Sequence, residues 1–115
     1  MNSPCLFCKI VSGQAPATIV YQDDLVTAFR DLHPVAPTHV LIVPNKHIHS
    51  VSQADGEDEL ILGRLFTVAR KVAEMDQITA RGYRTIVNTG EHGGQTVFHL
   101  HMHVIGGQRM KYPMG

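Results

Sequence analysis

Val97-Phe98-His99-Leu100-His101-Met102-His103-Val104-Ile105 alternates apolar residues with histidines. Successive side chains of a β-strand point to opposite faces of the sheet, so this pattern predicts a strand over 97–105. The face toward the core would carry Phe98, Leu100, Met102 and Val104. The other face would carry His99, His101 and His103, with neighbouring imidazoles ~7 Å apart because a strand rises ~3.3 Å per residue.

Three interpretations of the shared histidine face were weighed. A solvated polar face is disfavoured, because such faces usually mix Thr, Lys, Glu and Ser. A metal site is consistent with neighbouring histidines on one face, which can bind one zinc ion. A nucleophile with helpers is also consistent, because imidazole is nucleophilic at neutral pH and leaves well from phosphorus.

The glycine-rich loop from Asn88 to Thr96 leads directly into this strand. Within it, Gly93-Gly94-Gln95-Thr96 has a flexible backbone whose N–H groups could converge on an anion. An ordinary turn is the alternative. The position just before three histidines favours a phosphate cradle that faces a nucleophile. The chain has no Walker lysine motif and no paired carboxylates typical of a magnesium site, so we expect phosphate chemistry without magnesium.

The remaining pattern predicts two helices and four further strands. Ser3-Pro4 would open a short helix over Cys5 to Ser12, which Gly13 would end. A longer helix would follow a capping box of Ser52 and Asp55. Its buried face would carry Ile61, Leu65, Val68, Val72 and Met75, at helical spacing. The further strands would span residues 17–21, 25–30, 38–43 and 83–88. These elements predict an α+β domain with a five-stranded antiparallel sheet, one long helix and one short helix.

Composition limits the function classes. The 115 residues are 43% hydrophobic and carry ten Lys and Arg against ten Asp and Glu. We expect one domain, 1–115, with its own core. A neutral chain argues against a nucleic-acid surface. The start of the chain does not resemble a signal peptide, and no apolar stretch has the length of a membrane span, so we expect a cytoplasmic protein without a membrane partner.

The two cysteines form the motif Cys5-Leu6-Phe7-Cys8. In a chain without an export signal this spacing favours metal binding or redox chemistry over a structural disulfide. Two buried thiols without a chemical role are the alternative.

The segment His99-Leu100-His101-Met102-His103-Val104-Ile105 resembles the His-φ-His-φ-His-φ-φ signature of the histidine triad superfamily, where φ is apolar. The nucleoside phosphoramidase branch is the most similar, and the similarity runs from Phe7 to Tyr112. It also covers the loop 88–96, Phe29-Arg30-Asp31, Ala36-Pro37-Thr38-His39, Ile42-Val43-Pro44 and Gly106-Gly107. The dinucleoside polyphosphate hydrolase branch is less similar, because its triad is not expected to run into Gly-Gly.

The resemblance implies that a purine nucleoside 5′-monophosphate derivative is hydrolysed through a nucleotidyl-His101 intermediate. The backbone carbonyl of His99 would fix the tautomer of His101. His103 would contact the phosphate oxygens, and Thr96 would face the leaving group. His39 would lie behind the triad.

The resemblance also implies a nucleotide pocket. Asp31 would accept hydrogen bonds from the ribose hydroxyls. The base would lie in an apolar slot of Leu6, Phe7, Ile10, Phe29 and Leu32. The phosphate would contact Asn88, Gly94, Gln95 and Thr96 beside His101 and His103.

Other members of the superfamily hold a structural zinc ion, and the corresponding ligands here are Cys5, Cys8, His47 and His99. The branch forms homodimers, which implies a ten-stranded sheet joined through strand 83–88 and the long helix. The segment 108–115 would approach the partner's active site. Aminoacyl adenylates are candidate substrates by analogy.

Two other function classes remained open. A nucleotide-binding regulatory module would use the same pocket without turnover. A zinc-binding structural module would use the histidine cluster but would leave the glycine loop unexplained.

Overall fold

The computed structural model describes residues 4–111 and 113. Its elements, in chain order, are α1 (Leu6–Val11), β1 (Ile19–Gln22), β2 (Val26–Arg30), β3 (Thr38–Pro44), the 3₁₀ turns η1 (Val51–Gln53) and η2 (Gly56–Asp58), α2 (Glu59–Met75), β4 (Tyr83–Val87) and β5 (Met102–Gly106). In this part of the chain no helix combines the length and the apolar character that a bilayer crossing needs.

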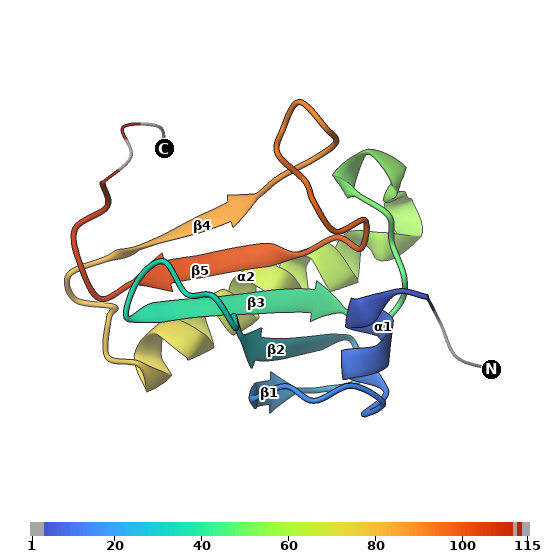
Figure 1. Cartoon of the computed structure of the whole chain (residues 1–115). Helices are drawn as coiled ribbons and strands as arrows, with labels where there is room; N and C mark the ends of the chain where they lie inside the picture. The colour runs from blue at the N-terminus through green and yellow to red at the C-terminus, as the bar shows by residue number, and fades with distance from the viewer. Residues whose placement is uncertain (1–3, 112, 114–115) are drawn as a thin grey trace.

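The five strands form one antiparallel sheet in the order β1-β2-β3-β5-β4 (Figure 1). The predicted α+β class with a five-stranded antiparallel sheet is therefore confirmed. Strand order was not readable from the sequence, and it places β5 between β3 and β4. The segments 38–44 and 102–106, far apart in sequence, are thereby hydrogen-bonded neighbours.

The central strand β3 is buried along its whole length because helices cover both of its faces. Val40 and Ile42 pack into the larger core with α2. Leu41 and Val43 point the other way and pack against Phe7 of α1. Because side chains alternate along β3, one face of the sheet packs against the long helix α2. The short helix α1 covers only part of the opposite face (Figure 1).

The histidine segment departs from the predicted strand over 97–105. Regular pairing begins only at Met102, and residues 97–101 run as irregular chain. The backbone N–H of Leu100 donates to the Ile48 carbonyl at 2.7 Å. The partner of the histidine segment at this point is therefore the loop after β3 and not a strand. Phe98 was predicted to face the core. It is instead 43% exposed and stacks on the ring of His49.

Both helix starts also differ from their predictions. The N-cap of α1 is Cys5, whose Sγ accepts the N–H of Cys8, and the predicted cap Ser3 lies outside the described residues. The capping box before α2 joins Asp55 to Asp58 and does not involve Ser52.

The predicted buried face of α2 is correct from Ile61 to Val72, but Met75 in the last turn is 51% exposed. The C-terminal segment 108–115 lies partly outside the described residues, so its predicted approach to a partner is not visible.

Candidate active site

A cavity of about 380 Å³ opens on the face of the sheet that α1 partly covers. Apolar residues make most of its wall: Leu6, Phe7, Ile10, Pro16, Ala17, Phe29, Leu32, Leu41 and Val97. Its polar lining is Arg30, Asp31, His33, Thr96, His101 and His103. An apolar slot with a few convergent polar groups is the usual form of a small-molecule site.

His101 lies in the wall of this cavity with its two ring nitrogens in different environments. Its Nδ1 lies 2.8 Å from the backbone carbonyl oxygen of His99. A carbonyl only accepts, so Nδ1 carries the hydrogen and donates it. In the neutral ring Nε2 therefore has an unshared electron pair. His101 is only 6% exposed, which limits competition from water for that electron pair.

His103 and His39 form a pair of imidazoles beside His101. His39 Nε2 lies 2.9 Å from His103 Nδ1 and 3.4 Å from Asp31 Oδ2. Burial lowers the pKa of His39. Burial, followed by the neighbouring His101 and His39 rings, lowers the pKa of His103 to about 4. Both rings are thus neutral at physiological pH.

The residues predicted to form a base slot line the cavity together, and they differ in exposure. Phe7, Ile10 and Phe29 are buried, whereas Leu6 is 53% and Leu32 81% exposed at the mouth. The Phe7 ring lies edge-on to Phe29 with centroids 5.5 Å apart. It also lies edge-on to His101 with centroids 5.2 Å apart, so Phe7 contacts both the slot and His101.

The glycine loop does not form the predicted cradle. The N–H of Gly94 donates to the Glu91 carbonyl, and the N–H of Gln95 donates to the Gly90 carbonyl. These two N–H groups are therefore used within the turn and do not converge on the cavity. Thr96 is the member of the predicted phosphate set in this loop that lines the cavity.

Side chains of the loop hold its own backbone. Asn88 Nδ2 donates to the Gly93 carbonyl, and the amide of Gln95 contacts Gly90, His49 and Val97. A Cβ on Gly93 would lie 2.3 Å from the Thr89 carbonyl oxygen, so this glycine permits a close backbone approach. In the described structure Asn88, Gly94 and Gln95 shape the loop and stay outside the cavity wall.

Sequence reasoning missed several lining residues, among them Leu41, Val97 and His33. His33 lies in the bend that follows β2. Its backbone N–H donates to Asp31 Oδ1 at 2.8 Å, which orients the carboxylate at the cavity edge. The position of His33 two residues after Asp31, itself a predicted site residue, is the feature of the sequence that could have indicated its place in the cavity wall.

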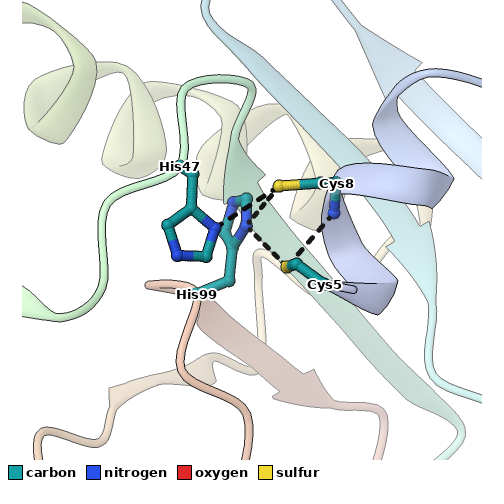
Figure 2. A group of neighbouring side chains, drawn as sticks. All are labelled: Cys5, Cys8, His47 and His99. Carbon is teal, nitrogen blue, oxygen red and sulfur yellow. Dashed lines mark hydrogen bonds between the residues drawn. The ribbon is translucent and has the colours of Figure 1, made fainter. Parts of the chain in front are cut away.

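Cys5, Cys8, His47 and His99 come together at the start of α1 (Figure 2). One ligand atom from each side chain lies within 4.8 Å of the other three. His99 Nδ1 lies 3.3 Å from Cys5 Sγ and 3.5 Å from Cys8 Sγ, and His47 Nδ1 lies 3.4 Å from Cys8 Sγ. These are the four residues that the resemblance implied as metal ligands.

The protonation of His99 suits a metal ligand. Its Nε2 lies 2.8 Å from the Pro44 carbonyl, so Nε2 carries the hydrogen and Nδ1 directs its electron pair at the two sulfurs. Metal-bound histidines commonly donate their second N–H to a carbonyl in this way. Burial also lowers the pKa of His99, which keeps the ring neutral.

Asp31, His39 and His103 form the other group of potential ligands within the described residues. Here the protonation is unsuitable. The backbone N–H of Val35 donates to His39 Nδ1 at 3.2 Å, so the hydrogen of the neutral ring is on Nε2. His39 Nε2, the atom that faces His103 and Asp31, therefore carries a hydrogen and has no electron pair for a metal ion.

The HIT domain family matches residues 12–110 of this chain. A protein of Escherichia coli K12 named purine nucleoside phosphoramidase is 54% identical, over 94% of this chain and 91% of that protein.

Two solved structures are also informative. A HIT family hydrolase from Clostridium thermocellum superposes with a TM-score of 0.94 at 44% identity, covering 99% of both chains. A zinc-bound histidine triad family protein from Mycobacterium smegmatis superposes with a TM-score of 0.81 at 29% identity, covering 94% of this chain and 78% of that one.

The low pKa of His103 predicts a pH-dependent stability. The groups that face this ring are His101, His39 and Asp31. As the pH falls below 6.5 the unfolded chain binds a proton at His103, but the folded chain does so only near pH 4. As the pH is lowered through this window, the free energy of unfolding should therefore decrease. His103 alone should contribute about 1 kcal/mol of this decrease per pH unit.

Urea unfolding of the wild type and of His103→Gln between pH 7 and 4 measures this contribution. Subtracting the free energy of unfolding of His103→Gln from that of the wild type at each pH cancels the contributions of the other titrating groups. Parallel pH profiles would contradict the assignment.

Proposed function

Because the chain belongs to the HIT domain family, we propose that it is a hydrolase of nucleoside 5′-monophosphate derivatives, a purine nucleoside phosphoramidase that acts through His101. The observation that carries this proposal is the unshared electron pair on His101 Nε2, at the wall of an apolar slot of nucleotide size. A pocket that only bound nucleotides would not need a nucleophile with a fixed tautomer.

The chemistry divides into two displacements at phosphorus. The electron pair of His101 Nε2 attacks the α-phosphorus, the P–N bond breaks, and the leaving amine takes up a proton. Water then attacks the phosphorus, the bond to Nε2 breaks, and the nucleoside monophosphate is released. Between these steps the His101 ring is positively charged, and its Nδ1–H bond to the His99 carbonyl stabilises that charge.

The cavity lining suggests how a substrate lies. The base enters between the apolar walls around Phe7 and Phe29, and the ribose hydroxyls donate to Asp31. Thr96 and His103 lie toward the phosphate, and Thr96 faces the leaving group. The slot selects bases by stacking and shape, since its wall around the base is apolar. An aminoacyl adenylate presents the same nucleotide portion as a phosphoramidate.

Replacement of the nucleophile tests the function. His101→Ala should lower the hydrolysis of adenosine 5′-phosphoramidate by roughly four orders of magnitude, because no other group takes over the attack. AMP binding, measured by calorimetry, should persist because the slot is retained. His49→Ala is the matched control, since His49 is exposed and lies outside the cavity.

Wild-type turnover in the His101→Ala variant would contradict the mechanism. Nucleotide binding by a wild-type protein without turnover of either a phosphoramidate or an adenylate would favour the regulatory module.

We also propose that Cys5, Cys8, His47 and His99 hold a structural zinc ion. Two thiols and two imidazoles match the closed tetrahedral set of such sites. The orientation of His99 Nδ1 toward both sulfurs supports this set. The N–H of Cys8 donates to Cys5 Sγ, which would stabilise a thiolate there. When bound, the ion would supply a crosslink between α1 and the histidine segment.

Metal analysis of the purified protein tests the site. We expect about one zinc ion per chain, and a loss of zinc in Cys8→Ser with a lower Tm. His92→Ala should keep both zinc and Tm, because His92 is exposed and outside the cluster. A zinc-free protein purified without chelators, whose Tm does not respond to added zinc, would refute the proposal.

We further propose a homodimer joined through β4 and α2, with a ten-stranded sheet across the two chains. Within the sheet of one chain β4 is an edge strand, paired only with β5. An unpaired strand edge is a template for another strand. On α2 the side chains of Phe66 and Leu60 are 62% and 67% exposed, which leaves apolar surface that a second chain would cover.

A charge on the exposed face of α2 tests the dimer. Phe66→Glu should shift the molecular mass measured by light scattering from dimer toward monomer, because a carboxylate would be buried at the interface. Thr67→Glu, at the neighbouring exposed position, is the charge-matched control. A wild-type protein that is monomeric at micromolar concentrations would refute this assembly.

A further inference from the structure

The carboxylate of Asp76, directly after α2, accepts three hydrogen bonds from the sheet. Arg30 donates to both oxygens, from Nη1 to Oδ2 and from Nη2 to Oδ1, the second bond at 2.9 Å. The hydroxyl of Thr38 donates to Oδ2 at 2.7 Å. A guanidinium that binds both carboxylate oxygens fixes the relative orientation of the two groups. Hydrogen bonding by Arg30 also lowers the pKa of Asp76, so the carboxylate is ionised at neutral pH.

Arg30 and Thr38 flank the loop that forms one side of the cavity. Arg30 is the last residue of β2 and Thr38 is the first residue of β3, so the loop spans 31–37. The loop residues that line the cavity are Asp31, Leu32 and His33. Asp76 is not part of the cavity wall. One carboxylate outside the cavity thus binds both ends of a loop whose side chains face the cavity.

Direct pairing between β2 and β3 stops at these ends. The last pair of the two strands joins Arg30 to Val40, whereas Thr38 pairs with Gly106 of β5. One further backbone hydrogen bond follows, from the N–H of Asp31 to the His39 carbonyl at 2.9 Å. The side chain of Asp76 therefore links the two strand ends where their direct pairing stops.

Asp31, the proposed ribose ligand, directly follows the anchored Arg30. Its side chain is 20% exposed, and its Oδ1 accepts the N–H of His33 at 2.8 Å, so the loop itself orients the carboxylate. A hydrogen bond between a hydroxyl and an oxygen spans only about 2.5–3.0 Å. A displacement of the loop by about 1 Å would therefore remove the contact between Asp31 and a ribose hydroxyl.

We propose that Asp76 is a positioning residue which, by binding Arg30 and Thr38 together, holds Asp31 where it accepts hydrogen bonds from the 2′- and 3′-hydroxyls of a ribonucleotide. The site would thus select nucleotides with an intact ribose over their deoxy analogues. The identity of the ligand rests on the proposed function, whereas the anchoring of the loop does not depend on it.

Amide hydrogen exchange in the ligand-free protein tests the anchor. Asp76→Ala removes all three hydrogen bonds, and the N–H groups of Asp31 and His33 should exchange at least about tenfold faster than in the wild type. Thr38→Val keeps the pair of Arg30 and Asp76 and should give a smaller increase at the same two amides. Unchanged exchange at both amides in these two variants would overturn the proposal, whether or not the protein binds nucleotides.

A matched pair of variants separates anchoring from a general loss of stability. Arg64 of α2 binds the carboxylate of Asp23, in the turn between β1 and β2, so it also joins the helix to the sheet. Arg30→Met and Arg64→Met each remove one pair of a guanidinium and a carboxylate. Only Arg30→Met should accelerate exchange at Asp31 and His33. Equal acceleration in the two variants would assign the effect to stability alone and would overturn the proposal.

Calorimetric binding of AMP and of 2′,3′-dideoxy-AMP tests the selection of ribose. The wild type should bind AMP about tenfold more tightly, because the analogue lacks the hydrogen bonds to a charged acceptor. In Asp76→Asn and in Arg30→Met this preference should largely disappear through weaker binding of AMP. The Kd of the dideoxy analogue should change by less than about twofold, because the base slot is retained. A merely structural defect would weaken the binding of both nucleotides.

Equal binding of the two nucleotides by the wild type, or a wild-type ratio of the two Kd values in both variants, would overturn the role in ribose selection. The proposed function fails separately, if His101→Ala retains turnover or if the wild type binds neither nucleotide. In that case the exchange rates of the ligand-free protein still decide whether Asp76 anchors the loop.

Discussion

The hydrogen bond from His101 Nδ1 to the His99 carbonyl is the contact on which the site depends. It gives His101 a nucleophilic Nε2, and it joins residues in the segment that runs irregularly before β5. In that segment the His99 ring points at the two cysteines instead of lining the cavity. The hydrogen bond between the two residues thus determines the tautomer of the His101 ring. The His99 ring points the other way and joins Cys5 and Cys8.

Backbone groups, and not charged side chains, determine the protonation of this site. The carbonyls of Pro44 and His99 accept from His99 and His101, and the Val35 amide donates to His39. Burial keeps the His39, His99 and His103 rings neutral by lowering their pKa values. Backbone dipoles do not titrate, so they favour the same tautomer whenever these rings are neutral.

Helix α1 connects the group of Cys5, Cys8, His47 and His99 to the apolar slot of the cavity. Cys5 and Cys8 flank Phe7, whose ring lies edge-on to Phe29, His99 and His101. A helix of six residues is too short to be stable on its own, so its position depends on these contacts and on the cluster. Anything that loosens the cluster is therefore expected to loosen the wall of the slot.

The alternation of apolar residues and histidines, with the helical spacing from Ile61 to Val72, was enough to predict the class of fold, whereas the four candidate metal ligands came from the resemblance to a family. Resemblance to a family supplied the roles. The predictions that failed depend on hydrogen bonds and packing contacts that the pattern of residue types does not specify. Phe98 is exposed because residues 97–101 pair with the loop at Ile48, and the N–H groups of Gly94 and Gln95 turn back on their own loop. The contact between His39 and His103 is encoded by no local pattern, because it arises only when β3 and β5 lie side by side.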